Sequence, residues 1–274
     1  MERVAVPNAP LPGSDLSRRP PSPLLRPYVR DFQGYREIPD GPVRRQTLPL
    51  DKVVVILGFE SPLAIGTERG RRVRPHTAFV AGLTDVPGFY ETRSASSGIQ
   101  MNMTPLGARL LFDCPMSEVA NQVVELNDLF GPAAPELIER LREADDWDAS
   151  FTILESFVAS RIADARPASP AVAWAWRALG ETGGRVSIGT LTEHLGWSRK
   201  HLISQFKEQV GLPPKTIARI FRFNRVLGCL EDNSDPNWLE IANLCGYYDQ
   251  AHLVRDFKQF AGTTPTQLSL QTVG

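Results

Sequence analysis

The spacing of hydrophobic and polar positions changes once along this chain, near Pro105. Before that residue the apolar side chains form short alternating or β-branched runs separated by Gly, Pro and Asp, and such runs predict β-strands. After it the apolar residues recur every three or four positions, which predicts helices. The predicted strands cover residues 28–35, 52–59, 77–83, 89–93 and 99–103, and the predicted helices cover 106–112, 116–125, 135–142 and 150–163. The pattern therefore predicts a small antiparallel barrel or sandwich with helices after it.

In the last third of the chain, one helical pattern occurs twice. Residues 198–214 (SRKHLISQFKEQVGLPP) and 249–265 (DQAHLVRDFKQFAGTTP) align without a gap. Each begins with a side chain that can cap a helix, Ser198 or Asp249, because its oxygen can accept from N–H groups that the first turn leaves unpaired. Each predicted helix has an apolar stripe for packing and a separate polar face that is free to contact another molecule.

Each of these helices follows a shorter amphipathic helix and a glycine turn. The shorter helices are predicted over residues 187–195 and 235–245, the second with Asp235 as its N-cap, and they run into Gly196 and Gly246. This order of elements is that of a helix-turn-helix motif, whose second helix enters the major groove of DNA. We therefore predict one motif at about residues 187–211 and another at about residues 235–262.

A linker helix is predicted between the two motifs, over about residues 215–231. At a rise of 1.5 Å per residue, this helix would be on the order of 20 to 25 Å long. With the turns at its ends, it can place two recognition helices about 34 Å apart, in successive major grooves on one face of DNA. A single chain could thus read two adjacent groove segments of double-stranded DNA.

The C-terminal part of the chain, over about residues 170–270, resembles the DNA-binding domain of the AraC/XylS family of bacterial transcription regulators. The second motif, GYYDQAHLVRDFKQFAGTTP, matches that family's most diagnostic pattern nearly throughout. The first motif departs from it at Thr192, where the family usually has a small residue and where a hydroxyl can bond back to a carbonyl one turn earlier. The resemblance implies a sequence-specific regulator, more often an activator that contacts RNA polymerase than a repressor.

The resemblance also implies which residues meet DNA, in the first turns of both recognition helices. These residues are Arg199, Lys200, Ile203 and Ser204 in the first helix, and Gln250, Ala251, His252, Val254 and Arg255 in the second. Their chemistry agrees in part, because Arg255 could bond to guanine and Gln250 to adenine. Lys207 and Lys258 lie further along and suit phosphates better. For His252, packing against buried neighbours is an equally good interpretation.

Charge supports DNA as the partner of the C-terminal part only. The whole chain of 274 residues has 30 basic and 31 acidic side chains, which by itself indicates no polyanionic partner. From Arg199 to Arg225, however, seven side chains are basic and only Glu208 is acidic. Such a local excess suits a polyphosphate, and it predicts binding that depends strongly on salt.

In patches such as LRPYVRDFQGY and VVELNDLFG, the preceding part of the chain loosely resembles the cupin-like sensory half of many AraC-type regulators. The resemblance implies a regulatory and dimerisation domain over residues 23–166, with a possible small-molecule effector and possible homodimer contacts. A purely structural role for these strands stays open. Residues 1–22 are rich in Pro, Ser and Arg and are predicted to form a flexible arm. The charges Arg44, Arg45, Arg71, Arg72 and Arg74 are expected in loops.

Two enzymatic alternatives compete with a regulator. The first is a metal-free barrel that modifies a small molecule and carries an accessory DNA-binding domain; a metal site is not expected, since His76 is the only histidine before His194. The second is a DNA-repair protein with a reactive cysteine, which the lack of basic or histidine neighbours around Cys114 disfavours. We therefore expect no enzymatic activity and no cofactor.

Cysteine usage and hydropathy point to the cytoplasm. The chain has three widely spaced cysteines, Cys114, Cys229 and Cys245, in apolar helical contexts, which indicates neither a disulfide framework nor a zinc site. No stretch is apolar enough for a signal peptide or for a membrane span.

Overall fold

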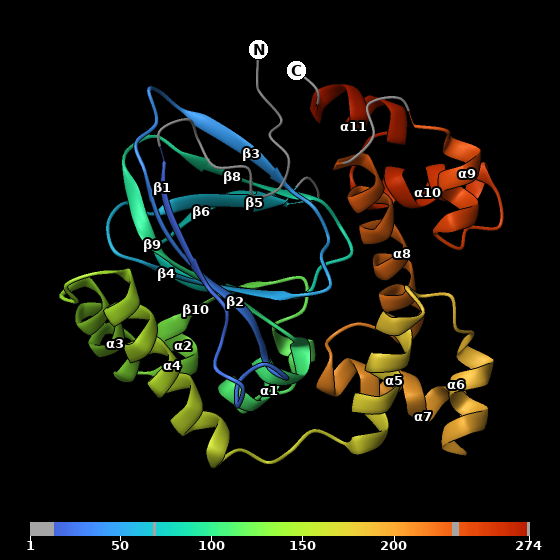
Figure 1. Ribbon diagram of the computed structural model, residues 1–274, viewed down its shortest axis with the longest axis horizontal. Coiled ribbons are helices and arrows are strands. Elements are labelled where there is room, and N and C mark those ends of the chain that lie inside the picture. Colours follow the sequence, from blue (N-terminus) through green and yellow to red (C-terminus); the bar gives the residue numbers. More distant parts are fainter. Residues whose placement is uncertain (1–13, 68–69, 232–235, 273–274) are drawn as a thin grey trace.

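A computed structural model of the chain describes residues 14–67, 70–231 and 236–272. Two antiparallel β-sheets and their flanking helices form the N-terminal half, and the C-terminal half is all helical (Figure 1). The predicted α+β fold class, with an N-terminal β-sandwich and a C-terminal helical domain, is therefore confirmed.

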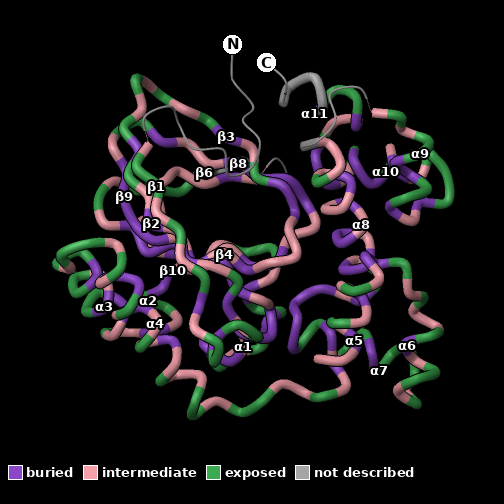
Figure 2. Tube along the Cα trace, viewed as in Figure 1, coloured by how far each residue is buried: buried purple, intermediate pink, exposed green. Residues whose placement is uncertain are grey.

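Two sheets face each other in the N-terminal half. In spatial order, the six-stranded sheet contains β1 (Asp15–Arg19), β2 (Val29–Glu37), β9 (Ser96–Met103), β4 (Val53–Gly58), β7 (Ala78–Ala81) and β10 (Val123–Glu125). The four-stranded sheet contains β3 (Val43–Thr47), β8 (Gly88–Thr92), β5 (Leu63–Thr67) and β6 (Gly70–His76). The central strands of the larger sheet are almost continuously buried, as expected for strands that are covered on both faces (Figure 2).

Helices cover the outer face of the larger sheet. They are α1 (Pro105–Phe112), α2 (Leu126–Phe130), α3 (Ala133–Arg142) and α4 (Trp147–Ala163). Helix α4 packs on β2, where Phe151 stacks on Phe32 at 6.1 Å between ring centroids. A β-carbon on Gly34 would collide with the Trp147 ring, so this close approach requires glycine.

The structure differs from the sequence prediction over residues 116–125. Only Met116–Glu118 is helical there, as a 3-10 turn, and Val123–Glu125 forms strand β10 instead of a helix. Strand β10 pairs with β7, with Val124 opposite Val80. This pairing joins segments about 40 positions apart, so it overrides the local helical spacing that the sequence displays.

Two further predictions about the N-terminal half were wrong. Asp15–Arg19, which falls in the predicted flexible arm, is strand β1, because it pairs along its whole length with β2 and its Arg19 bonds to Glu155 of α4. Residues 1–13 lie outside the described residues. The charges expected in loops lie in strands instead: Arg44 and Arg45 in β3, and Arg74 in β6.

Seven helices form the described part of the C-terminal half. They are α5 (Pro170–Glu181), α6 (Ile188–Leu195), α7 (Arg199–Gln209), α8 (Pro214–Glu231), α9 (Trp238–Leu244), α10 (Gln250–Phe260) and α11 (Pro265–Thr272). Helix α9 starts later than predicted, because the side chain of Asn237 accepts from the N–H groups of Leu239 and Glu240 and so caps it. The predicted cap, Asp235, lies outside the described residues.

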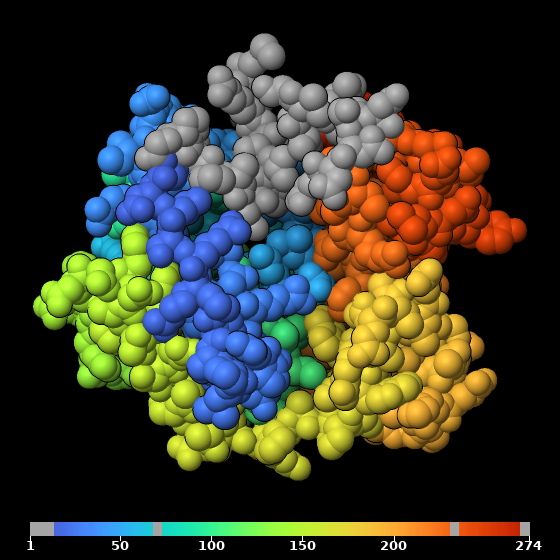
Figure 3. Space-filling view, in the orientation of Figure 1, coloured from blue at the N-terminus to red at the C-terminus, as the bar shows by residue number. Residues whose placement is uncertain are grey.

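The two halves lie side by side in direct contact (Figure 3). Helix α7 contacts the 3-10 turn at Met116–Glu118, and Gly211 lies against Met116 so closely that a larger residue would crowd it. Farther along, Gln46 Nε2 of β3 donates to the carbonyl oxygen of Ala261, at 2.8 Å. Buried residues of both halves thus form one continuous hydrophobic cluster.

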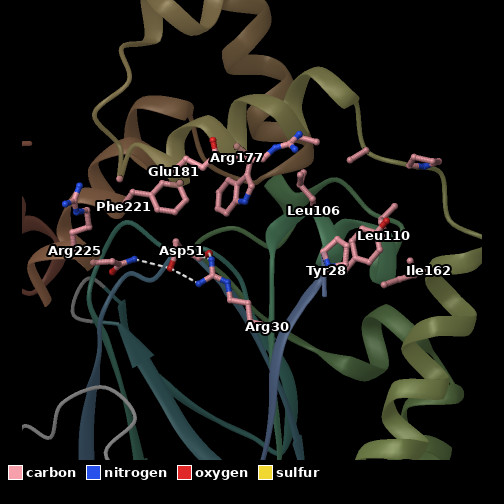
Figure 4. A pocket seen from close by; sticks show the side chains of 18 of the residues that line it. Tyr28, Arg30, Asp51, Leu106, Leu110, Ile162, Arg177, Glu181, Phe221 and Arg225 are labelled. Carbon is pink, nitrogen blue, oxygen red and sulfur yellow. Dashed lines mark hydrogen bonds and ion pairs between the residues drawn. The ribbon is translucent and has the colours of Figure 1, made fainter. Parts of the chain in front are cut away.

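A cavity of about 1160 Å³ lies between the halves (Figure 4). On the N-terminal side, Arg30 pairs with Asp51, with Nη2 and Oδ2 2.6 Å apart. Asn224 of α8, which also lines the cavity, hydrogen-bonds to segment 49–51. Phe221 of α8 and Arg177 of α5 line the opposite wall, so the linker helix takes part in the contact between the halves.

Candidate DNA-binding surface

The first motif consists of α6, a tight turn and α7. Ser187 caps α6 by accepting from the N–H of Thr190, and Ser198 caps α7 by accepting from the N–H of His201. Between them Gly196 has a φ of +64°, a left-handed conformation that glycine adopts without strain. The hydroxyl of Thr192 donates to the carbonyl of Gly189 at 2.8 Å, as predicted for this departure from the family pattern.

The second motif repeats this design with α9 and α10. Gly246 has a φ of +82°, and Asp249 caps α10 by accepting from the N–H of His252 at 2.6 Å. The apolar stripes of both recognition helices are fully buried, through Leu202 and Phe206 in α7 and Leu253 and Phe257 in α10. Burying one side of each helix fixes which side chains point outward.

In α7, all five of the predicted contact residues are exposed. They are Arg199, Lys200, Ile203, Ser204 and Lys207. Ile203 is the notable member, because 39% of this apolar residue is open to solvent. An exposed aliphatic side chain in the middle of a basic face can contact the methyl group of thymine.

In α10, the predicted residues divide into exposed and half-buried ones. Gln250, Ala251, Arg255 and Lys258 are exposed, whereas His252 and Val254 are half-buried. The His252 ring meets Tyr247 edge to face, at 5.2 Å between centroids, and its burial lowers its pKa. The geometry thus favours a packing role for His252, one of the two interpretations that the sequence left open.

Sequence reasoning did not single out Tyr248 in the turn before α10. This residue is 91% exposed, the most open of the large apolar side chains in the described part of the chain. The sequence does contain an indication of this residue, because the second turn is one residue longer than the first. The longer turn places an extra aromatic residue beside the N-terminus of α10.

The β-sandwich encloses a second feature of interest, a cavity of about 570 Å³ between its two sheets. Apolar side chains such as Ile56, Ile65 and Phe79 line much of it. At one end, Arg45 is only 5% exposed, lies 3.4 Å from Glu37 and donates to the Tyr90 hydroxyl at 3.0 Å. A mostly apolar cavity with a few convergent polar groups is typical of small-molecule sites.

Burial changes the ionisation of several groups in this cavity. It raises the pKa of Tyr35, and nearby Glu37 and Tyr90 add to that effect. It also raises the pKa of Tyr90 and lowers the pKa of Lys52 at the cavity wall. Each shift follows from the cost of a charge in a low-dielectric environment.

The surroundings of Cys114 do not favour the alternative of a DNA-repair protein with a reactive cysteine. Burial raises the pKa of the Cys114 thiol, and the carboxylates of Glu118 and Asp113 raise it further, which is the opposite of what a reactive thiolate needs. Among the described residues, no group of His, Cys, Asp and Glu side chains could hold a metal ion. Likewise, none of the helices described combines the length and apolar character needed to span a membrane.

Comparison with known proteins bears on the C-terminal half. Residues 191–271 match a family model described as a helix-turn-helix domain. The uncharacterized HTH-type transcriptional regulator YbfI of Bacillus subtilis (strain 168) is 34% identical over 68 residues, which are 25% of this chain and 24% of that protein. The F1 operon positive regulatory protein of Yersinia pestis is 34% identical over 82 residues, 30% of this chain and 27% of that protein.

The chain therefore spans about a quarter of the length of these curated relatives. Among solved structures, ToxT from Vibrio cholerae O395 is similar over 95% of this chain and 98% of its own, at 11% identity and a TM-score of 0.47. Residues 191–271 are therefore a helix-turn-helix domain, in agreement with the resemblance of this region to the AraC/XylS family that the sequence displays.

Proposed function

We propose that the protein is a sequence-specific transcription regulator, and more specifically an activator, that inserts α7 and α10 into successive major grooves of double-stranded DNA. We assign DNA binding to residues 170–270 and regulation, with possible dimer contacts, to residues 23–166. The main support is the pair of capped helices that each bury one stripe and expose a polar or basic face. The relative from Yersinia pestis is named as a positive regulatory protein, which favours activation.

The first experiment asks whether the full chain selects a DNA sequence, by randomised oligonucleotide selection at low ionic strength. We expect enrichment of one motif long enough to span two groove segments. Activation is then tested by transcription in vitro with RNA polymerase on a promoter that carries the selected operator. Failure of the correctly folded chain to enrich any sequence would contradict the proposal.

Two basic residues one turn apart on α10 should have different effects on DNA binding. Arg255 lies where it could bond to a base, so Arg255→Ala should cost about 1–3 kcal/mol on the operator and relax specificity at one position. Lys258 suits a phosphate, so Lys258→Ala should weaken binding to all sequences alike and lower the salt dependence by about one unit of slope. Equal behaviour of both variants in binding assays on operator and scrambled duplexes would contradict the assignment.

We also propose that a small molecule in the sandwich cavity regulates DNA binding. The cavity wall reaches the second motif, because Gln46, which lines the cavity, donates to Ala261 directly after α10. A ligand can shift such an arrangement only if it favours one conformation over another. If the ligand displaced β3, the strand that carries Gln46, the hydrogen bond from Gln46 to Ala261 would transmit that displacement to α10.

Thermal melts of the full chain across a panel of metabolites test this regulatory role. A cognate ligand should raise the melting temperature selectively, in proportion to the logarithm of its concentration above Kd. Ala81→Phe, which fills part of the cavity, should abolish that rise, whereas Ala64→Phe should keep it, since Ala64 does not line the cavity. An equal response of both variants would place the ligand elsewhere.

A further inference from the structure

The linker helix carries a basic stripe that faces the second recognition helix. Lys215, Arg219 and Arg222 are spaced four and three residues apart on α8, which places them on one side of it. The flank of α10 meets this side around a hollow of about 480 Å³, which we call the α8–α10 hollow. Arg255 and Asp256 line it from α10.

The charges in the α8–α10 hollow are unbalanced. Four cationic side chains line it against one carboxylate, that of Asp256. That carboxylate is engaged by Arg219, whose Nε and Nη2 lie 3.0 and 2.7 Å from Oδ1. In the part of the chain that the structure describes, Lys215, Arg222 and Arg255 have no acidic partner. Three cations therefore converge without a counter-charge.

The hydrogen bonds of these cations leave donors available. Arg222 donates through Nη1 to the carbonyl of Gly184 at 2.6 Å, and its Nη2 has no hydrogen-bond partner among the described residues. Arg255 donates to the carbonyl of Ala251 at 3.3 Å, a long bond that an anion could replace. An oxyanion with several acceptor oxygens matches this set of donors, and a phosphate is the common biological example.

The hollow also has a rigid wall beside the DNA-facing side of α10. Arg219 is held by Asp256 and by Gln259 Oε1, at 2.7 Å, and its guanidinium lies over the Phe260 ring. Arg255 lines the hollow and is exposed on the same side of α10 as Ala251, one turn earlier. The hollow thus lies on the flank of the surface proposed to enter the major groove, where DNA carries its backbone.

We propose that the α8–α10 hollow binds one phosphate of the DNA backbone, with Lys215 and Arg222 as its ligands and Arg255 shared between phosphate and base. The proposal rests on the proposed DNA-binding function. Neutralising a phosphate releases condensed counterions, so each such contact adds about 0.9 to the slope of log affinity against log salt concentration. The basic stripe on α8 therefore fixes the position of α10 on the duplex and contributes no sequence preference of its own.

The first test compares variants of the full chain on its selected operator across a series of KCl concentrations. Lys215→Ala should lower the salt slope by about 0.9 and weaken binding about tenfold on operator and scrambled duplexes alike. Arg225→Ala is the matched control, because Arg225 lies on the same helix but lines the cavity between the halves. That variant should keep the salt slope of the wild type.

The second test locates the phosphate. Operator duplexes each carry one uncharged methylphosphonate, and the position of the substitution is moved along both strands. Wild type should lose affinity at several positions, and Lys215→Ala should lose less affinity than wild type at one of them, because Arg222 and Arg255 still contact that phosphate. A double-mutant cycle on that position then gives the coupling between Lys215 and the phosphate.

The outcomes separate this inference from the function on which it rests. If wild type binds its operator but Lys215→Ala keeps the full slope and couples to no methylphosphonate position, the phosphate site is wrong and DNA binding stands. If wild type binds no DNA, both fail. A third measurement uses inorganic phosphate as the probe. Suppose that phosphate raises the melting temperature of wild type but not of Lys215→Ala, and that the mutation leaves DNA binding unchanged. The hollow then binds a free phosphate, and its assignment to the DNA backbone is overturned.

Discussion

Replacement of Phe223 by alanine is expected to lower the free energy of unfolding of the C-terminal domain by about 4–5 kcal/mol. Phe223 is fully buried in α8 and meets Phe257 and Phe260 of α10 edge to face, at 4.8 and 5.4 Å between centroids. Truncation of a buried Phe costs about 3–5 kcal/mol, and the loss of two aromatic pairs places this variant in the upper part of that range. Since domains are stable by only about 5–15 kcal/mol, this loss removes a large part of the stability of the C-terminal domain.

Urea unfolding of the full chain, followed by circular dichroism, measures this loss. Phe223→Leu should cost roughly 1.5 kcal/mol or less, because it keeps most of the apolar volume. Tyr248→Ala, at an exposed aromatic residue of the same motif, should change stability by about 0.5 kcal/mol at most. A loss below about 1 kcal/mol for Phe223→Ala would mean that α8 and α10 do not depend on each other for packing.

The sequence predicted the recognition helices well because their determinants are local. A cap, an apolar stripe and a terminal glycine lie within a dozen residues of one another, and the duplication repeats the same signal. The caps Ser198 and Asp249 form the predicted hydrogen bonds. Exposure of the polar face then follows from burial of Leu202 and Leu253 on the opposite side.

The features that the sequence did not predict depend on residues far apart along the chain. Strand β3 reads VRRQT, which is too polar to predict as a strand, yet its pairing with β8 buries Arg45 beside Glu37. Pairing with β2 likewise makes a strand of Asp15–Arg19, which belongs by composition to a flexible arm. The α8–α10 hollow needs the packing of two helices, and neither helix alone reveals which of its arginines face the other.

Removal of the Arg219 side chain is expected to destabilise the same domain by about 3 kcal/mol. Asp256 is only 2% exposed, and both hydrogen bonds to its Oδ1 come from Arg219. In Arg219→Met, therefore, a charged carboxylate stays buried after its partner has gone, a change that costs roughly 3–5 kcal/mol. We take the low end of that range, since Arg219 itself is partly exposed and solvent can enter its place. Urea unfolding of the full chain again measures the change.

The double variant Arg219→Met/Asp256→Leu separates the cost of an unpaired charge from the value of the pair itself. Apolar replacement of both partners should recover most of the lost stability, because a buried ion pair contributes little net stability once its desolvation is counted. Because the pair is neutral as a whole, the hollow keeps its net charge in the double variant, and the salt slope of DNA binding should equal that of wild type. The double variant could instead be as unstable as Arg219→Met. In that case the ion pair and its hydrogen bonds would themselves stabilise the domain, and the cost of an unpaired buried carboxylate would not explain the loss.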